Sequence, residues 1–453
     1  MALALVAAAV AMFGRKRTSV AAAGALAIIA VFLITLLLWG SGTFPNFKCT
    51  KLFILKRKLK NWSKLDPMVK KLLILGGGTG GLLISKEVRQ RLGPEEVEIT
   101  VVDMKDRAEF RPSYLYVAFG YRKPEQISAP LEHLKKYKIN FVKAKVTKID
   151  PANRRVSTTA GDFTYDNLVV ALGAETVDTG LPHTWELEPA LKVAETLPQI
   201  KQGHVVIGVY SLPYRCPPAP IELAMLTHFY FLTRGLRDKV KITVVHPLKR
   251  PFENFGPMAT RWMSGFLQQL GIEYVGVGQG QAIKSIGKNE LELTNGERVK
   301  FDAAFVVPPH KAPDPVLDSD LAKNGWAAPR NPASGDFRSE KYDDVYVIGD
   351  VAAPNVPVGM AGTILHSYSP WVVNNIAADL AGVSLGNPPF RVTGTCALDV
   401  GGFGMVAACD FTPFVKKQKP YPDCTFLPPS LAARILKEMF EKMYFNWLLG
   451  VVP

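Results

Sequence analysis

The stretch LLILGGGTGGLLISKEVRQRL, residues 72–92, constrains the fold of this chain more than any other feature. An apolar run of strand type enters a glycine-rich turn and a helical pattern leaves it, with Gly76, Gly78 and Gly81 in G-x-G-x-x-G spacing. Glycines at these places allow a tight turn and a close approach of the backbone to a pyrophosphate at the helix N-terminus. A second apolar run ends in Asp103, 22 residues after Gly81, where a carboxylate can bond a ribose. The unit therefore predicts a bound dinucleotide.

Short Val/Ile/Leu runs alternate with helical stretches along the rest of the body, which is typical of α/β folds with parallel sheets. We expect strands at 71–76, 97–103, 167–173, 204–210, 241–247, 303–309 and 345–350. The stretch 147–168 indicates a hairpin with its turn at Asp150–Asn153, and 310–340 is rich in Pro, Asp and Gly, which indicates surface loop.

The stretch KYDDVYVIGDVAAP, residues 341–354, places Gly349 and Asp350 directly after an apolar strand. A strand followed by Gly-Asp recurs near the C-terminus of flavoproteins with two dinucleotide folds, where the Asp meets the ribityl chain of FAD. Together with the first motif, this pattern favours FAD over NAD as the ligand.

A second strand of nucleotide-binding type, HVVIGVY at 204–210, continues into SLPYRCPPAPIE and not into a glycine loop. Four prolines stiffen this turn and remove N–H donors, so a pyrophosphate cradle cannot form there. We therefore expect electrons to enter the flavin from a donor other than NAD(P)H. Cys216 in this turn is the candidate, and RVTGTCALDVGGFGM at 391–405 offers Cys396 as its partner. Two thiols can pass two electrons to a flavin and leave a disulfide.

The chain resembles the sulfide:quinone oxidoreductase and flavocytochrome c sulfide dehydrogenase family over about 68–450. The landmarks that match in order are GGGTGG, EFRPSYLYVAFG (109–120), CPPAPIE (216–222), VYVIGD and GTCALD (394–399). The resemblance implies two Rossmann-like domains, an FAD domain and an inserted, degenerate NAD-type domain. It also implies a redox pair of Cys216 and Cys396, with Cys396 nearer the flavin, and a role for Glu222 in proton handling or positioning.

The resemblance further implies FAD contacts at nine residues, namely Gly76, Gly78, Thr79, Gly81, Asp103, Arg111, Gly173, Asp350 and Gly359. Many family members carry a third cysteine before a Glu-Pro, but here Leu187 stands at that place, and 107–120 contain no cysteine. FAD is therefore expected to be bound non-covalently. The expected organisation is 1–67 anchor and basic linker, 68–178 and 326–390 FAD domain, 179–325 second domain, and 391–453 C-terminal redox and membrane region.

The N-terminal segment contains one long apolar stretch with basic clusters on both sides. Residues 1–71 carry twelve Lys or Arg and one Asp, so only +3 of the net charge of +14 remains for the other 382 residues. The uncharged stretch 19–40 is long enough to cross a bilayer as a helix, and basic clusters on both sides leave its orientation open. We interpret the charge as attraction to a lipid surface, not to nucleic acid. An alternative is that translation begins at Met68.

The C-terminal segment predicts a helix capped by Ser430, with apolar residues from Leu431 to Leu448 on one face and charged residues, including Lys437 and Glu441, on the other. Two interpretations stay open: a helix docked on the core, or an interfacial helix in the headgroup layer. Phe403 and Phe411 are our choice for a quinone slot. A homo-oligomer or a cytochrome partner stays open.

The remaining cysteines, Cys49, Cys409 and Cys424, match no landmark, and no His/Cys cluster has metal-binding spacing. Inert burial is the simpler interpretation of Cys409 and Cys424, and extension of a sulfur chain is the other. The predicted function is oxidation of sulfide to sulfur or polysulfide with a membrane quinone as acceptor. The alternatives are a sulfide dehydrogenase that reduces a cytochrome, a type II NADH:quinone oxidoreductase, and a non-catalytic, membrane-tethered flavoprotein subunit.

Overall fold

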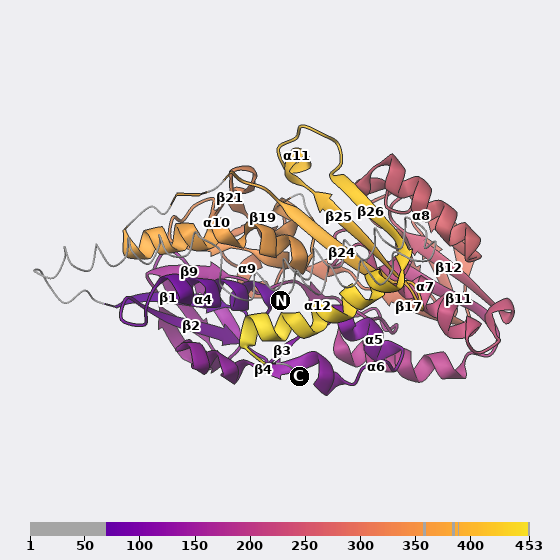
Figure 1. Cartoon of the computed structure of the whole chain (residues 1–453), viewed down its shortest axis with the longest axis horizontal. Coiled ribbons are helices and arrows are strands. Elements are labelled where there is room, and N and C mark those ends of the chain that lie inside the picture. Colours follow the sequence, from indigo (N-terminus) through magenta and orange to yellow (C-terminus); the bar gives the residue numbers. More distant parts are fainter. Residues whose placement is uncertain (1–68, 357–358, 383–385, 388, 452–453) are drawn as a thin grey trace, which may run out of the picture. The chain divides into compact units, whose positions relative to one another are not determined.

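The glycine-rich stretch lies at the carboxyl end of an inner strand of a seven-stranded sheet (Figure 1). The computed structural model describes residues 69–356, 359–382, 386–387 and 389–451. The sheet has the order β21-β22-β23-β9-β1-β2-β5, and its strands from β23 to β5 are parallel. Their bounds are β1 Lys70–Leu75, β2 Val97–Asp103, β5 Asn140–Lys143, β9 Asn167–Val170, β21 Pro329–Asn331, β22 Asp336–Ser339 and β23 Val345–Val347.

The two faces of this sheet are covered by different layers. Leu72 and Ile74 of β1 join the core under α4 (Thr79–Arg91) and α10 (Gly362–Ala381), which pack against each other (Figure 1). The alternate residues, Leu73 and Leu75, point to the opposite face, as the pleat of a strand requires. That face is covered by β6 (Val146–Asp150), β7 (Arg155–Thr158), β8 (Gly161–Thr164) and α9 (Asp314–Leu317). Strands buried on both sides explain the continuous apolar runs.

The expected hairpin over 147–168 is a three-stranded antiparallel meander of β6, β7 and β8. Its first turn lies where the sequence predicts it, because the Asp150 carboxylate accepts a hydrogen bond from the N–H of Asn153 at 3.2 Å. The sequence did not predict the second turn, at Thr158–Gly161. There the hydroxyl of Thr158 donates to the carbonyl of Gly161 at 2.8 Å.

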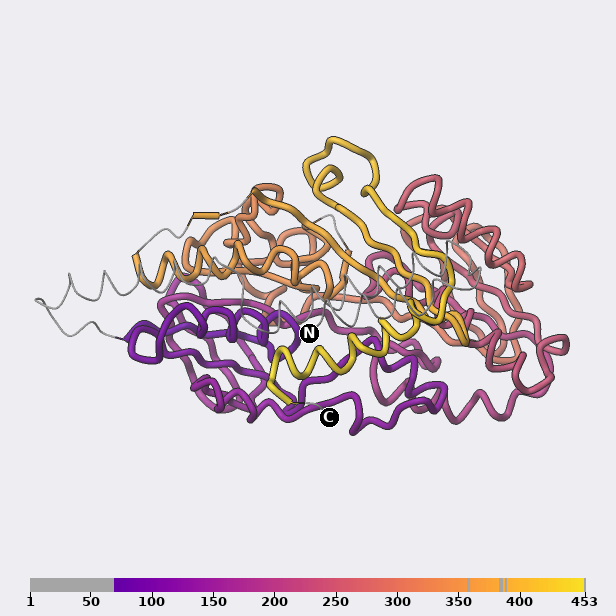
Figure 2. The backbone as a smooth tube through the Cα atoms, in the orientation of Figure 1, coloured from indigo at the N-terminus to yellow at the C-terminus, as the bar shows by residue number. Residues whose placement is uncertain are grey.

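A second, four-stranded parallel sheet has the order β13-β12-β11-β17. Its strands are β11 Gly203–Val209, β12 Val240–His246, β13 Ile272–Gly276 and β17 Ala303–Val307. One face packs against α6 (Leu187–Thr196), α7 (Ala219–Leu232) and α8 (Pro257–Gln269), and the other against β14 (Ile283–Ile286), β15 (Glu290–Leu293) and β16 (Arg298–Lys300). Figure 2 lets the reader follow the chain out of the first sheet after β9 and back into it at β21.

The expectation of surface loop over 310–340 is wrong in part. This stretch contains β18 (His310–Lys311), β19 (Ala322–Lys323) and β20 (Trp326–Ala327), and it adds β21 and β22 to the first sheet. Trp326 and Phe337 are buried, so the segment contributes to the core despite its Pro and Gly content.

Shorter elements complete the described chain. They are β3 Arg107–Glu109, α5 Tyr114–Ala118, β4 Ser128–Pro130, β10 Glu175–Thr176 and α11 Thr412–Val415, with 3-10 helices at Arg111–Ser113, Pro124–Ile127, Leu131–Tyr137, Leu197–Gln199, Arg237–Lys239, Glu253–Phe255, Pro332–Ser334, Gly349–Val351 and Ala353–Asn355.

The C-terminal part forms an antiparallel sheet of β24 (Thr393–Asp399), β25 (Gly404–Asp410) and β26 (Asp423–Ser430), followed by α12 (Leu431–Leu449). The predicted cap of α12 is confirmed, because the Ser430 hydroxyl accepts a hydrogen bond from the N–H of Ala433. The helix packs against β24, β25 and α4 (Figure 1).

The faces of α12 differ from the prediction. Lys437 and Glu441, expected on the polar outer face, are 5% and 1% exposed and point into the protein. Five apolar residues are at least one third exposed and form what we call the outer face of α12, namely Leu431, Ile435, Phe440, Met443 and Trp447. The helix therefore docks on the core by a side that contains charges and presents apolar side chains outward.

Within the described part of the chain, no helix is long and apolar enough to span a bilayer. The transmembrane helix predicted over 19–40 lies outside the described residues and stays a prediction.

Candidate active site

The turn between β1 and α4 has the shape that a pyrophosphate needs. Gly76 has φ +106°, and a Cβ there would stand 2.3 Å from the carbonyl oxygen of Ala171. A Cβ on Gly81 would stand 1.8 Å from the carbonyl oxygen of Gly76, so a side chain at either place would force the turn open. A Cβ on Gly78, the N-cap of α4, would meet no atom within 4 Å. Open space at this helix N-terminus fits a dinucleotide phosphate.

Asp103 supports this turn from the end of β2. Its carboxylate accepts hydrogen bonds from the N–H groups of Gly77 (2.6 Å) and Lys105 (2.7 Å). Each carboxylate oxygen can accept a further hydrogen bond, so a ribose hydroxyl can still be bound there. Thr79, predicted only as a cofactor contact, has its hydroxyl 3.1 Å from the hydroxyl of Tyr444 in α12.

Asp350 lies at the same carboxyl edge of the sheet, after β23. Loss of solvent around this half-buried side chain raises the pKa of Asp350 to about 6, and the nearby Arg111 guanidinium opposes this rise. Among the described residues, no hydrogen bond to its carboxylate is formed. A carboxylate in this state fits a ligand hydroxyl that donates to it. Gly173 follows β9 at this edge as well.

The loop that carries Cys216 lies against the segment after Asp350. The N–H of Cys216 donates to the carbonyl of Met360 at 2.8 Å, and a Cβ on Gly359 would stand 3.5 Å from the ring of Pro217. Cys216 has φ +58°, an uncommon conformation for a residue with a side chain that is enriched at functional sites. The thiol thus lies beside the segment that is predicted to contact FAD.

The N-terminus of α7, next to this loop, offers little to a second pyrophosphate. Pro218 is its N-cap residue and Pro220 follows inside the first turn, so two N–H donors are missing. The buried Tyr214 donates its hydroxyl to the carbonyl of Pro217 at 3.0 Å and fills the turn. This helix N-terminus therefore differs from the glycine turn before α4, and the lack of a nicotinamide site in this domain stays a prediction.

Arg215 is a buried residue that the sequence reasoning missed. Its guanidinium donates to the carbonyl of Trp185 (3.0 Å) and to Glu186 (2.6 Å), and the Trp185 indole N–H donates back to the Arg215 carbonyl (2.7 Å). Glu186 is also 3.5 Å from Arg111, so the carboxylate lies between two guanidinium groups. The sequence offered one indication of this cluster, which is the position of Glu186. It directly precedes Leu187, where many family members carry a third cysteine.

Cys216 and Cys396 are both free, half-buried thiols that pack against the same hydrophobic cluster. Cys396 lies in β24, which packs against α7, the helix that follows Cys216. Burial raises the pKa of Cys396 to about 11. Burial also raises the pKa of Cys216, and the charge of a Cys396 thiolate would raise it further. The geometry on which the pair rests is that β24, which carries Cys396, packs against α7, which follows Cys216.

Glu222 is 4% exposed and forms a buried ion pair with Lys437 of α12. Its carboxylate also accepts a hydrogen bond from the N–H of Asp399, three residues after Cys396, at 2.7 Å. Burial raises the pKa of Glu222, and Lys437 opposes that rise. Helical periodicity placed Lys437 on the solvent side, which is why the prediction missed it.

The two residues chosen for a quinone slot do not lie together. Phe403 is 55% exposed in the turn before β25, whereas Phe411 is buried directly after β25. A strand rises about 3.3 Å per residue, so the seven residues of β25 separate them by roughly 25 Å. One narrow slot cannot use both side chains, and this part of the prediction is wrong.

Cys409 and Cys424 form a disulfide across the paired strands β25 and β26. Cys409 packs in the core below α10, whereas Cys396 packs in the core of the second domain. Neither interpretation from the sequence, inert single thiols or links in a sulfur chain, included this bond. Its place indicates a structural cross-link between the two strands.

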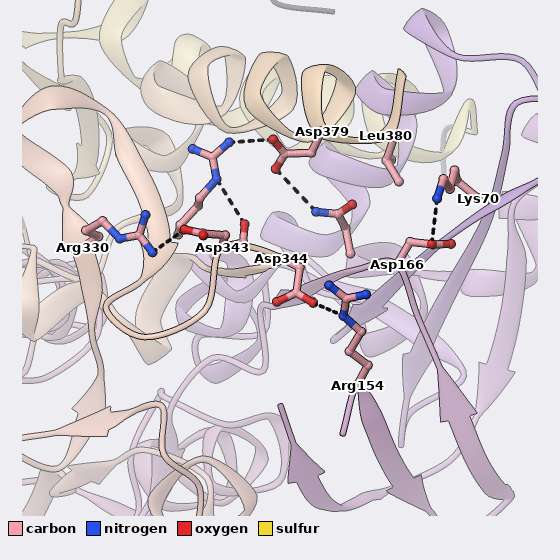
Figure 3. A pocket seen from close by; sticks show the side chains of 10 residues that line it. Lys70, Arg154, Asp166, Arg330, Asp343, Asp344, Asp379 and Leu380 are labelled. Carbon is pink, nitrogen blue, oxygen red and sulfur yellow. Dashed lines mark hydrogen bonds and ion pairs between the residues drawn. The ribbon is translucent and has the colours of Figure 1, made fainter. Parts of the chain in front are cut away.

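A charged pocket of about 540 Å³ lies at the opposite, amino-terminal edge of the first sheet, where β1, β9 and β23 begin (Figure 3). Its acidic and basic side chains point toward one another and form four ion pairs: Lys70–Asp166, Arg154–Asp344, Arg330–Asp343 and Arg338–Asp379. Because the charges are matched within the pocket and its position is remote from the glycine turn, we assign it a structural role.

Comparison with known proteins places this chain in a family. The family model described as pyridine nucleotide-disulphide oxidoreductase matches residues 70–367. The chain is 27% identical to the sulfide-quinone reductase of Aquifex aeolicus over 84% of this chain and 91% of that protein. The solved structure of the Aquifex aeolicus sulfide:quinone oxidoreductase superimposes with a TM-score of 0.71 at 25% identity, over 84% of this chain and 91% of that one.

Type II NADH:quinone oxidoreductases are similar too. The one from Staphylococcus aureus strain NCTC 8325 is 26% identical over 74% of this chain and 90% of its own. The predicted resemblance to sulfide:quinone oxidoreductases is confirmed. The predicted cofactor is FAD, and the family and the similar sulfide:quinone oxidoreductases bear this out. The chain is a flavoprotein oxidoreductase that belongs to the pyridine nucleotide-disulphide oxidoreductase family.

Proposed function

We propose that this protein oxidises sulfide to sulfur or polysulfide through a disulfide between Cys216 and Cys396 and passes the electrons to a membrane quinone. The observation that carries this proposal is the hydrogen bond from the N–H of Cys216 to Met360. This hydrogen bond holds the thiol of Cys216 beside the segment that is expected to contact the flavin. In an NADH-dependent enzyme, the nicotinamide ring would have to reach the flavin at this place. The sulfide:quinone oxidoreductases among the similar proteins support the same chemistry.

FAD binding would divide between two groups of residues. Gly76, Gly78, Thr79, Gly81 and Asp103 would hold the adenosine diphosphate half. Arg111, Gly173, Asp350 and Gly359 would hold the flavin half, with Asp350 accepting from the ribityl chain. No cysteine lies between Met68 and Arg215, which supports non-covalent binding.

The chemistry begins at the cysteine pair. A sulfide sulfur attacks Cys216 Sγ, the bond between Cys216 and Cys396 breaks, and its electron pair goes to Cys396. Cys216 then carries a persulfide and Cys396 a thiolate. FAD, when bound, supplies a two-electron acceptor for the thiolate. The apolar cluster around both half-buried cysteines limits the access of water to these steps.

The outer face of α12 supports docking on a membrane, where a lipid-soluble quinone is available. The same helix carries Arg434, Glu438 and Lys442 with side chains 30%, 43% and 44% exposed, and exposed apolar residues beside charged ones are found in helices of the headgroup layer. This arrangement needs no membrane-spanning helix. A cytochrome acceptor would need a docking surface of complementary charge, and nothing in the described surface favours one specifically.

The test is anaerobic titration of the FAD-loaded protein with sulfide, with flavin bleaching followed at its visible absorbance and reoxidation by a soluble quinone. Cys216→Ser and Cys396→Ser should each abolish sulfide-dependent quinone reduction, whereas the paired variant Cys409→Ala/Cys424→Ala should keep it. Full activity in both serine variants would refute the cysteine mechanism. Bleaching by NADH at comparable rates would assign the protein instead to the type II NADH:quinone oxidoreductases.

A further inference from the structure

The buried pair of Glu222 and Lys437 poses a question that the proposed function does not answer. Glu222 lies on α7 among apolar side chains and Lys437 lies on α12, and they are 4% and 5% exposed. A buried ion pair is weak evidence for stability, because the cost of removing two charges from water offsets much of their attraction. Its position next to the two thiols indicates a role in their chemistry.

Lys437 has few other anions to pair with. Asp399, whose N–H donates to Glu222, has a carboxylate that accepts hydrogen bonds from the Tyr116 hydroxyl (3.1 Å) and the Gly401 N–H (2.8 Å) and lies 3.5 Å from Arg434. Glu441, one turn along α12, is bonded to Arg122 and Ser113. The Tyr116 ring, with its centroid 5.2 Å from the ammonium nitrogen, carries no charge.

Four elements therefore surround Lys437, and their charged or titratable groups are accounted for. They are α7 with Glu222, β24 with Cys396 and Asp399, α5 with Tyr116, and α12 itself with Arg434, Glu441 and Glu438, which is 3.4 Å from Arg434. Among the described residues, only Glu222 and the thiols are left to compete for this cation.

A buried site of this kind is stable only if the charges inside it sum to zero. While the two cysteines are joined, the Glu222 carboxylate and the Lys437 ammonium sum to zero. When the disulfide opens, Cys396 becomes an anion, and an uncompensated buried charge is very costly. The site stays neutral only if Glu222 takes up a proton at the same time.

We propose that Lys437 is a positioning residue that changes partner during the reaction, from the Glu222 carboxylate to the Cys396 thiolate. The inference rests on the proposed function. As the sulfur of H₂S bonds to Cys216 Sγ, one of its protons goes to Glu222, and the electron pair of the broken sulfur–sulfur bond goes to Cys396. Cys216 then holds an S–SH group, Glu222 is neutral, and the ammonium balances the thiolate.

The electrostatics of the site agree with this exchange. Glu222 raises the pKa of Cys396 and Lys437 lowers it, on top of the larger rise from burial. Glu222 likewise raises the pKa of Cys216, and Lys437 lowers it.

The test measures the thiolate fraction of Cys396 in the reduced, FAD-loaded protein. The rate of alkylation by iodoacetamide between pH 7 and 9 is followed by mass spectrometry of the Cys396 peptide. Below the thiol pKa, a shift of one unit changes this rate about tenfold. Lys437→Met should lower the rate at least about tenfold, and Glu222→Gln should raise it by a similar factor. Lys437→Arg, which keeps the charge, should stay close to the unsubstituted protein.

Lys442→Met, on the same helix with a 44% exposed side chain, is the matched control and should change nothing. If Lys437→Met alone fails to fold, Glu222→Gln/Lys437→Met leaves no unpaired charge and should alkylate more slowly than Glu222→Gln. If Lys437 had only a structural role, its replacement by Met would loosen the site and make alkylation of Cys396 faster. Faster alkylation in Lys437→Met, or shifts of the same sign for both single variants, overturns the proposal. Because alkylation needs no sulfide, this result is independent of whether the cysteine mechanism itself holds.

Discussion

The hydroxyl of Tyr444 lies 3.1 Å from the hydroxyl of Thr79, although 365 residues separate them. Thr79 begins the helix that follows the glycine turn, and Tyr444 is buried near the end of α12. The C-terminal helix is thus bonded to the glycine turn through Tyr444 and, two turns earlier, to Glu222 through Lys437. One helix thus connects the glycine turn, the ion pair of Glu222 and Lys437, and the exposed apolar outer face.

Tyr444→Phe should weaken FAD binding without unfolding the protein. The substitution keeps the ring contacts with Phe110 and Phe445 and removes one hydrogen bond, which contributes about 1 kcal/mol. We expect roughly fivefold faster loss of flavin, measured by the recovery of free FAD fluorescence on dilution. Tyr421→Phe is the control, because the ring of Tyr421 lies against Gly256 at the N-terminus of α8. An equal effect of both variants would contradict the assigned role.

Polar substitutions on the outer face of α12 should reduce binding to lipid vesicles. Leu431 and Ile435 are 58% and 49% exposed, so Leu431→Ser/Ile435→Ser should fold normally and lose apolar area that would be buried in the headgroup layer. The measurement is co-sedimentation with phosphatidylcholine vesicles, using a chain that starts at Met68, where the compact unit begins. Leu232→Ser, on α7 and 53% exposed, is the matched control. Unchanged sedimentation of the double variant would argue against docking by α12.

Removal of the Cys409–Cys424 disulfide should cost stability and leave activity intact. The bond closes a loop with a sequence separation of 15, for which chain entropy predicts about 3 kcal/mol. Cys409→Ala/Cys424→Ala should therefore lower the free energy of unfolding by about 2–4 kcal/mol in denaturant titration. If sulfide-dependent quinone reduction fell in the folded variant, the pair would take part in sulfur transfer after all.

His246 should make the protein less stable in mild acid. Its Nδ1 accepts from the N–H of Leu248 at 2.9 Å, so Nε2 carries the proton and donates to Tyr214 at 2.9 Å. Burial lowers the pKa of His246 from 6.5 to about 3. Because the folded pKa is depressed, the stabilisation is present above pH 6.5 and is lost as the pH falls toward 3.

The measurement is the unfolding free energy of the unsubstituted protein minus that of His246→Gln, across this pH range. The difference should fall by about 1.4 kcal/mol per pH unit. Taking the difference removes the contributions of the other buried histidines and of Asp350, whose raised pKa acts in the opposite sense. Parallel curves for the two proteins would show that His246 is not the titrating group.

The sequence by itself determined the glycine turn, most strands of the two parallel sheets and the lack of a second glycine-rich loop, whereas β5 and β13 were not predicted. These features are local: glycine spacing, apolar runs and prolines act on their own backbone, and no distant residue can replace them. The cap of α12 at Ser430 belongs to the same class.

Only the tertiary structure decided which face of α12 points inward, which partner Glu222 has, and that Cys409 and Cys424 are joined. Helical periodicity assigns charged residues to solvent because burying a charge alone is costly, and Lys437 escapes that rule through a carboxylate 215 residues away. Such pairings depend on how distant elements meet, and no local pattern encodes them.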